Sequence, residues 1–398
     1  KFLIGSNIKE SKEKEIEVRP EFFMIDMTNK CNLRCNYCLR NLEQEENCIS
    51  TEKLRDIGKF ITTYCDEYKI ANISVQAWGG EPLLEKNKII ALTKFITPQK
   101  TKVHYSIETN ATLLTNDVIE ELYKNHIGIG ISIDGDRKCH DLQRTFVSGK
   151  GSYDTVKKNL LQAQRYYKNK IGTITTITKQ TAVHIEKIIE HLVLDLHISN
   201  IKLNFVHAST YTHGQNQCLN TQEIADTELR ILYKIIELQE RGYDVMEHNI
   251  FIKLKNLLFR EYADICLSCG CCGGEKMIVF DMDGNIYPCE LTDDASFVIG
   301  SIYKKESLIE QIKMTIDKDK AFFKMKKAVE CEKCYWKFFC RGGCTVRALS
   351  EKRQMEVIDI DHIECAINQV LYPALMELVL RKPHIVNQML GEDLLVDE

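Results

Sequence analysis

The 398-residue sequence lacks the features that direct a protein to nucleic acid or into a membrane. Its 53 lysines and arginines are slightly outnumbered by 57 aspartates and glutamates, so no basic field is available for a phosphate backbone. No apolar run approaches the ~20 residues that span a bilayer, because charges interrupt the longest ones. Residues 1–17 are charged and lack the apolar centre of a signal peptide. Tandem repeats and low-complexity linkers are also absent, so we expect no nucleic-acid or membrane partner.

Cysteine, by contrast, is abundant, with 17 residues. A secreted disulfide scaffold would be short and rich in loops. Here the count is odd, and several cysteines lie two or three residues apart within a long chain of helical and strand patterns. This distribution favours metal or cluster ligation in a reducing cytoplasm.

Between residue 21 and about residue 206, short β-branched runs alternate with amphipathic helical patterns. The expected strands are 22–27, 72–77, 103–108, 127–133, 173–178 and 201–206, and the expected helices include 51–68, 115–125, 153–168 and 181–194. This alternation predicts an α/β fold with a parallel sheet and right-handed crossovers. Six such strands predict a partial (β/α)6 TIM barrel, whose chemistry would lie in the loops at the carboxyl ends of the strands.

The pattern changes after the predicted barrel. Residues 221–262 are expected to be mostly helical, with Thr221 as a helix N-cap. After Cys266, short strands such as 277–280, tight turns and clustered cysteines predominate. We therefore divide the chain into an N-terminal extension (1–20), a core (21–220), a helical bridge (221–262), a cysteine-rich domain (263–372) and a C-terminal helix with its tail (373–398).

Three cysteines spaced C-x3-C-x2-C follow the first expected strand: Cys31, Cys35 and Cys38. Three thiolates leave one iron of a four-iron cluster without a protein ligand, and an open iron is a place for chemistry. This spacing resembles that of the radical S-adenosylmethionine (SAM) enzymes, in which SAM occupies the open iron and is cleaved to a 5′-deoxyadenosyl radical. The alternatives are an incomplete zinc site, although zinc prefers four ligands, or scattered buried thiols.

Further segments resemble the same family, each near the end of its own expected strand. They are Gly79-Gly80-Glu81-Pro82, Glu108-Thr109-Asn110-Ala111 and Ser132-Ile133-Asp134-Gly135, which is followed by Arg144. The resemblance implies that the glycines and Glu81 approach the SAM amino group, that Arg144 contacts its carboxylate, and that an aromatic residue contacts adenine. The implied SAM-binding residues are Tyr37, Gly79, Gly80, Glu81, Thr109, Asn110, Ser132, Asp134 and Arg144. An ordinary turn at Gly79-Gly80 and a surface ion pair at Arg144 are the alternatives.

A second group of cysteines resembles the SPASM domain, the auxiliary-cluster module of certain radical SAM enzymes. The family pattern C-x(9–15)-G-x4-C is matched by Cys272-x11-Gly284-x4-Cys289, and a C-x2-C-x5-C-x3-C array follows. The resemblance implies two fully ligated [4Fe–4S] clusters, one held by Cys266, Cys272, Cys289 and Cys344, the other by Cys331, Cys334, Cys340 and Cys365. Cys269 and Cys271 are surplus, and could replace Cys266 or Cys272 or have no role. A zinc ribbon is the alternative for this region.

The resemblance implies an oxidoreductase acting on a peptide or protein, with three [4Fe–4S] clusters, SAM and a flavodoxin or ferredoxin reductant. The leading hypothesis is oxidative modification or crosslinking, through a thioether or carbon–carbon bond, of a ribosomally made precursor peptide. Only about 20 residues precede the first strand, so the leader would bind a missing module, a separate partner protein or an edge strand.

One alternative is an anaerobic sulfatase-maturating enzyme, which converts Ser or Cys to formylglycine. That branch has a catalytic Asp directly after the cysteine of a Tyr-Pro-Cys-Asp segment, where this chain has Glu290. Glu290 is therefore a candidate base, one methylene longer, or else a solvated turn residue. A zinc or iron–sulfur binding regulatory module is the non-enzymatic alternative.

Overall fold

The computed structural model describes residues 18–40, 45–206, 217–259, 270–292, 295–317, 329–350 and 360–391. Six parallel strands form its centre, in the order of the chain: β1 (Phe22–Thr28), β2 (Asn72–Gly79), β3 (Lys102–Thr109), β4 (Ile127–Ser132), β5 (Gly172–Ile177) and β6 (Asn200–Phe205). The expected partial barrel is confirmed. β7 (Met246–Glu247) adds a short parallel strand beyond β6, and the ends of the sheet do not pair with each other.

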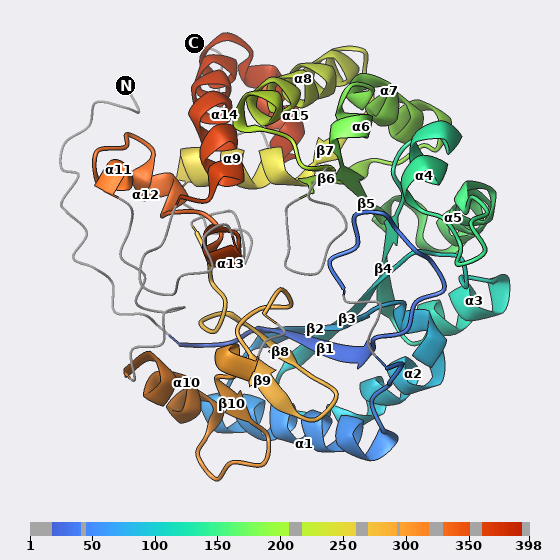
Figure 1. The fold of residues 1–398 in the computed structure, drawn as a ribbon, viewed down its shortest axis with the longest axis vertical. Coiled ribbons are helices and arrows are strands. Elements are labelled where there is room, and N and C mark those ends of the chain that lie inside the picture. The colour runs from blue at the N-terminus through green and yellow to red at the C-terminus, as the bar shows by residue number, and fades with distance from the viewer. Residues whose placement is uncertain are drawn as a thin grey trace.

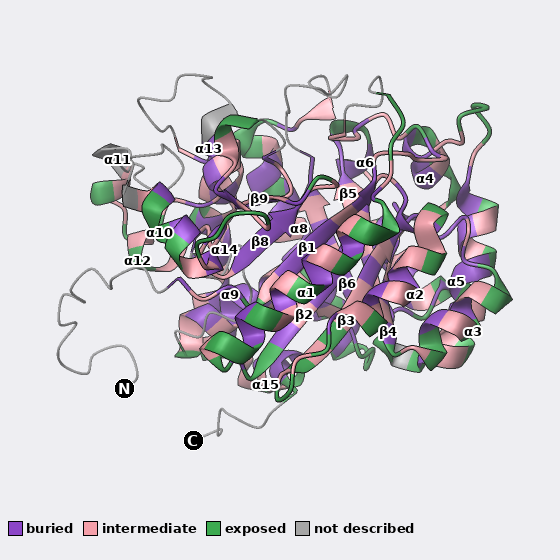
Figure 2. Ribbon diagram, turned by 90° about the horizontal axis from the view of Figure 1, so that it is seen from below, coloured by how far each residue is buried: buried purple, intermediate pink, exposed green. Residues whose placement is uncertain are grey.

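Helices cover the outer face of this curved sheet (Figure 1). They are α1 (Thr51–Tyr68), α2 (Lys86–Phe95), α3 (Asn116–Lys124), α4 (Arg137–Gln143), α5 (Tyr153–Tyr167), α6 (Lys179–Ala182), α7 (Ile185–Glu190) and α8 (Thr221–Glu240). Along β5 and β6, buried residues alternate with half-exposed ones, so one face of each strand packs under the helices and the other lines the lumen. The buried faces appear as the purple strands in Figure 2.

Two details of the helices differ from the sequence prediction. The single helix expected at 181–194 is replaced by α6, α7 and a π-helical turn at His191–Asp195. A capping box between Thr178 and Thr181 fixes the start of α6 at Lys179, and α7 begins separately at Ile185. Thr221 is not the N-cap of α8, because Asn220 caps it and exchanges hydrogen bonds with Glu223.

The cysteine-rich region continues the barrel sheet. β8 (Met277–Phe280) pairs in parallel with β1, β9 (Asn285–Tyr287) runs antiparallel to β8, and β10 (Gly300–Ser301) completes that edge. α10 (Leu308–Asp317) packs against β10. At the other end of the sheet, α9 (His248–Phe259) packs against β6 and β7, and α14 (His362–Arg381) and α15 (Pro383–Leu390) pack against α8 and α9 (Figure 1). α12 (Lys337–Cys340) contacts α14, and the remaining short helices are α11 (Val329–Glu332) and α13 (Thr345–Ser350). The division into domains stays a prediction, and α14 runs unbroken through the boundary placed after residue 372.

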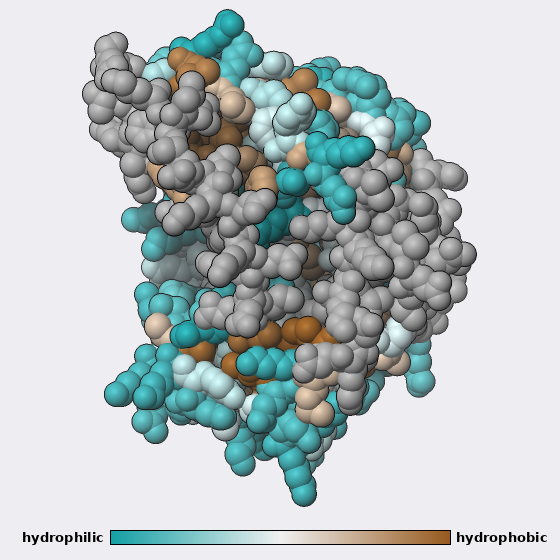
Figure 3. All heavy atoms as spheres, turned by 90° about the vertical axis from the view of Figure 1, so that its left-hand side faces the viewer, coloured by the Kyte–Doolittle hydropathy of each residue, from teal (hydrophilic) through white to brown (hydrophobic). Residues whose placement is uncertain are grey.

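Contrary to the sequence expectation, one described helix, α14, is long and apolar enough to cross a membrane by length and composition. It packs against α8, α9 and α15, and Leu371, Tyr372 and Leu375 on it are buried. This packing accounts for its apolar character. On the side of the molecule where α14 lies, apolar side chains gather in separate areas with polar ones between them (Figure 3).

Candidate active site

The loop after β1 carries Cys31, Cys35 and Cys38 and is fastened to the end of β2. The Gly80 backbone N–H donates to the Thr28 carbonyl at 2.7 Å, and the Glu81 backbone N–H donates to the Lys30 carbonyl at 2.8 Å. A Cβ on Gly79, whose φ is +141°, would lie 2.3 Å from the Thr28 oxygen, and one on Gly80 would lie 2.2 Å from a backbone oxygen of the same loop. The two glycines are therefore required by a close backbone approach to the cysteine loop.

Glu81 is buried and ties the end of β2 to the end of β3. Its carboxylate accepts hydrogen bonds from the Thr109 hydroxyl at 2.7 Å and from the Asn110 backbone N–H at 2.8 Å. A third comes from the Leu83 N–H. Burial raises the pKa of Glu81, and these donors oppose the rise. Its oxygens thus have protein partners in this structure, and its contact with the SAM amino group stays a prediction.

Asn110 extends this connection to the cysteine loop itself. Its Nδ2 donates to Asn32 Oδ1 at 2.9 Å and lies 3.8 Å from Cys31 Sγ. Asn32 in turn donates to the Thr112 hydroxyl at 2.7 Å. The carboxyl end of β3 therefore sets the position of the first cysteine.

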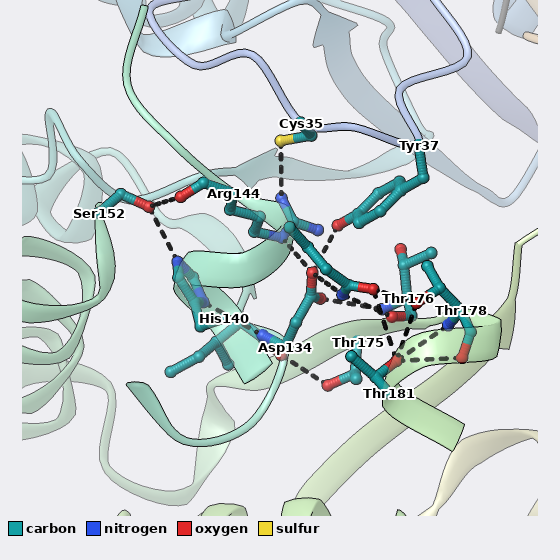
Figure 4. A network of polar contacts seen from close by, with 12 residues as sticks. Cys35, Tyr37, Asp134, His140, Arg144, Ser152, Thr175, Thr176, Thr178 and Thr181 are labelled. Carbon is teal, nitrogen blue, oxygen red and sulfur yellow. Dashed lines mark hydrogen bonds and ion pairs between the residues drawn. The ribbon is translucent and has the colours of Figure 1, made fainter. Parts of the chain in front are cut away.

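Asp134, after β4, is the centre of a buried polar network (Figure 4). Its Oδ2 accepts from the Tyr37 hydroxyl at 2.7 Å, from Arg144 Nε at 2.9 Å and from Gln143 Nε2 at 2.9 Å. Its Oδ1 accepts from the Thr176 backbone N–H at 3.0 Å. Asp134 is thus engaged by the protein on both oxygens, and its predicted SAM contact stays a prediction.

Arg144 is buried, so the surface ion pair considered from the sequence is wrong. Burial would lower the pKa of Arg144, but the Asp134 carboxylate and other acidic neighbours raise it above its ordinary value. Its Nη1 lies 4.0 Å from Cys35 Sγ, and its guanidinium lies 5.3 Å from the centre of the Tyr37 ring. Nη2 has no hydrogen-bond partner among the described residues, so this donor is available to an anionic ligand group. Ser132, also a predicted SAM contact, is half-buried at the end of β4.

The donor set fits an iron–sulfur cluster with one open iron. Burial raises the pKa of the Cys31 thiol to about 11 and that of Cys35 to about 12, and the three thiols interact electrostatically. Such thiols stay protonated until metal ions displace their protons. Across the described ranges, no three His, Cys, Asp or Glu side chains lie close enough together to hold a single metal ion.

A second set of charged side chains faces the lumen from several strands. Glu108 on β3 bonds to Gln76 on β2, and it interacts electrostatically with Lys202 on β6 and with Glu290. Burial raises the pKa of Glu108, Lys202 lowers it and Glu290 raises it again. Glu290 accepts a hydrogen bond from Cys289 Sγ at 3.1 Å. Neither Glu108 nor Lys202 is among the site residues predicted from the sequence, although the alternation of side chains along a strand could have placed both on the inner face.

The later cysteines fall into two groups. Four of them line one pocket together with Trp336 and Asp361: Cys331, Cys334, Cys340 and Cys365. This is the set that the sequence predicts for one auxiliary cluster. Cys344 interacts electrostatically with Cys271 instead.

The other predicted auxiliary ligands lie near β8. Cys289 is buried in an apolar cluster with Met24, Met277 and Val279. Cys272 is half-buried, and its carbonyl accepts backbone N–H groups from the turn before β8. Cys266 and Cys269 lie outside the described residues.

Comparisons with known proteins agree with this geometry. Residues 25–192 match the model of the Radical SAM superfamily. The Cysteine-type anaerobic sulfatase-maturating enzyme of Clostridium novyi is 26% identical over 327 residues, which cover 80% of this chain and 85% of the relative. Among solved structures, native anSMEcpe with bound AdoMet and Cp18Cys peptide superposes with a TM-score of 0.77 at 21% identity, covering 91% of this chain and 99% of that one. Streptococcus suis SuiB bound to precursor peptide SuiA gives 0.61 at 17% identity, covering 85% and 74%.

Proposed function

We propose that this chain, whose residues 25–192 form a radical SAM domain, is a maturase that oxidises a side chain of a peptide or protein. One observation carries the proposal: the loop of Cys31, Cys35 and Cys38 is fastened by the strand ends that hold Glu81, Asn110 and the Asp134–Arg144 pair. When bound, the cluster and SAM supply one-electron chemistry that abstracts hydrogen from unactivated carbon.

The chain's own residues would bind and orient these groups. The three cysteines would hold three irons, and Arg144 Nη2 would donate to the SAM carboxylate. Asp134 acts as a positioning residue, because it holds the Arg144 side chain and the Tyr37 ring in place. The other expected SAM contacts are Gly79, Gly80, Glu81, Thr109, Asn110 and Ser132, together with the Tyr37 ring at the adenine.

Two auxiliary clusters would bring the total to three. The pocket of Cys331, Cys334, Cys340 and Cys365 supports one of them, since four thiols give a cluster no open iron. A fully ligated cluster is suited to electron transfer. We expect the enzyme in a reducing cytoplasm, with a flavodoxin or ferredoxin as its reductant.

Two reactions remain candidates for the substrate of this maturase. Crosslinking or other oxidation of a precursor peptide is favoured by the departure at Glu290, which is longer than the Asp of the sulfatase-maturating branch. Formylglycine formation is favoured by the similarity to the sulfatase-maturating enzyme of Clostridium novyi, which matches this chain over most of the length of both proteins. In both cases Glu290 is the candidate base, because its carboxylate shares the lumen with Glu108 and Lys202.

Anaerobic purification with iron and sulfide analysis tests the proposal. We expect about twelve irons per chain and formation of 5′-deoxyadenosine from SAM under reducing conditions. Cys31→Ala should abolish that product and leave about eight irons, whereas Cys48→Ala, at a cysteine outside the three predicted sets, should change neither. Stoichiometric zinc without visible absorbance would refute the proposal.

Mass spectrometry distinguishes the two substrate hypotheses. Incubation with a cysteine-containing sulfatase peptide would give an aldehyde if the chain forms formylglycine. A crosslinked precursor peptide would instead lose two hydrogens and resist proteolysis between the joined residues.

A further inference from the structure

Two buried ion pairs connect α9, α13 and α14 beside the cysteine pocket. Asp361, directly before α14, pairs with Arg347 on α13. Glu364, in the first turn of α14, pairs with Lys253 on α9. Arg347 Nη2 also lies 3.4 Å from Glu364 Oε2, so the two pairs form one connected group of four charges. No side chain of the four is more than 15% exposed, and two cations are balanced by two carboxylates.

Asp361 contacts predicted ligands of both auxiliary clusters. Its Oδ2 accepts from the Cys344 backbone N–H at 2.7 Å and from Arg347 Nη2 at 2.7 Å. Its backbone carbonyl accepts from the Cys365 N–H at 2.9 Å. It also lines the pocket of Cys331, Cys334, Cys340 and Cys365. One residue therefore connects Cys344, assigned to the first auxiliary cluster, with the pocket assigned to the second.

The loop before Cys344 packs closely on this carboxylate. A Cβ on Gly343, whose φ is +72°, would lie 2.7 Å from Asp361 Oδ2 and 2.9 Å from the Glu364 Cβ. Only glycine adopts this backbone without strain and leaves room for the contact. Asp361 Oδ1 accepts from the Glu364 N–H at 3.2 Å and so caps α14. Asp361 is thus held through both oxygens, and it fixes the Cys344 loop relative to α14.

Stability alone does not account for four buried charges at this place. Replacing a buried ion pair by well-packed apolar residues is often neutral or stabilising. The potential of an iron–sulfur cluster, by contrast, depends on the charges and hydrogen bonds around it. A charged group that contacts the ligands of two clusters therefore has an electrostatic effect on both.

We propose that Asp361 and Arg347 form a positioning pair for the two auxiliary clusters: they fix Cys344 relative to the pocket and set the potentials of both clusters. The proposal rests on the proposed function, because it requires iron–sulfur clusters at both sets of cysteines. Reduction adds negative charge to a cluster. The Arg347 guanidinium favours the reduced state and the Asp361 carboxylate opposes it, so the balance of the two charges determines the potential.

The test measures cluster potentials by redox titration followed by electron paramagnetic resonance, on full-length holoenzyme purified anaerobically. Asp361→Asn removes the carboxylate charge, keeps its shape and still caps α14. We expect about twelve irons, as in the wild type, and a shift of both auxiliary potentials to higher values. Arg347→Gln removes the opposite charge and should shift the same potentials to lower values. Circular dichroism shows whether each variant is folded.

A double variant and a control distinguish charge from shape. With both charges removed in Asp361→Asn/Arg347→Gln, the auxiliary potentials should return toward the wild-type values. Glu377→Gln is the matched control, because it breaks an exposed ion pair with Arg381 on the same helix and should leave the potentials unchanged. Structural damage alone would not give shifts of opposite sign that cancel in the double variant.

Unchanged auxiliary potentials in the single variants, or shifts in the same direction, overturn the proposal. If one single variant loses its clusters, the shift in the other decides by its sign. If both lose them, retention in the double variant supports the proposal and loss there overturns it.

The proposed function fails differently: wild-type protein would form no 5′-deoxyadenosine, while the potentials would still respond to the substitutions. The response of the Cys31–Cys35–Cys38 cluster signal to added SAM should be the same in all variants, because that site is unchanged.

Discussion

Replacing Asp134 by Asn removes one charge from the buried network and leaves its shape unchanged. The Arg144 guanidinium then loses the carboxylate that it is hydrogen-bonded to, and an amide N–H₂ replaces an oxygen that accepted three donors. Breaking a buried ion pair from one side costs about 3–5 kcal/mol. Unfolding entropy of ~2.1 cal/mol/K per residue converts this cost into a fall in Tm of about 4–6 °C for a chain of this length.

The assay measures Tm by circular dichroism and SAM affinity by calorimetry, both on anaerobic holoenzyme. We expect the lower Tm together with at least a tenfold loss of SAM affinity, because Arg144 and Tyr37 lose the group that orients them. Asp136→Asn is the matched control. Asp136 caps α4 by accepting from the Cys139 N–H at 2.9 Å, and Asn caps helices equally well. Wild-type Tm and affinity in Asp134→Asn, or equal damage in the control, would refute the reasoning.

Three further predictions concern the barrel and its neighbouring helices. Gly80→Ala should lower SAM cleavage by more than tenfold and reduce iron content, because its Cβ would meet backbone at 2.2 Å, whereas Gly172→Ala, with its nearest contact at 4.0 Å, should leave both unchanged. Burial and nearby carboxylates raise the pKa of Glu228 to about 8. Stability should therefore fall as pH rises from about 4.5 to about 8, by at most about 5 kcal/mol, and Glu228→Gln should unfold like wild type near pH 4.5 but at higher temperature at pH 8. Glu108→Gln should shift the pH profile of product formation while 5′-deoxyadenosine formation persists, because Glu108 interacts electrostatically with the candidate base Glu290; an unchanged profile would contradict that coupling.

The sequence predicted the six strands well because their patterns are local. β-branched runs between helical patterns indicate buried parallel strands, and β1 to β6 agree with those expectations within two residues at either end. The motifs could also be assigned to strand ends, since each follows its own run. The break between α6 and α7 was missed, because no glycine or proline marks it between Lys179 and Glu190.

Long-range features could not be predicted in this way. The pairing of β8 with β1 depends on a contact between residues some 250 positions apart, and no local pattern specifies it.

The residues of the family motifs in this site form hydrogen bonds with one another, in addition to any that they would form with a ligand. Glu81 and Asp134 are both buried carboxylates, and the described residues provide donors to both oxygens of each. A sequence motif cannot distinguish a residue that contacts SAM from one that holds the contacting residue, because evolution would preserve either. The distinction is physical: a positioning carboxylate should affect Tm and SAM affinity together, whereas a donor such as Arg144 Nη2 should affect affinity more than stability. Comparing Arg144→Lys, which keeps the charge but loses the planar fork, with Asp134→Asn would therefore separate the two roles.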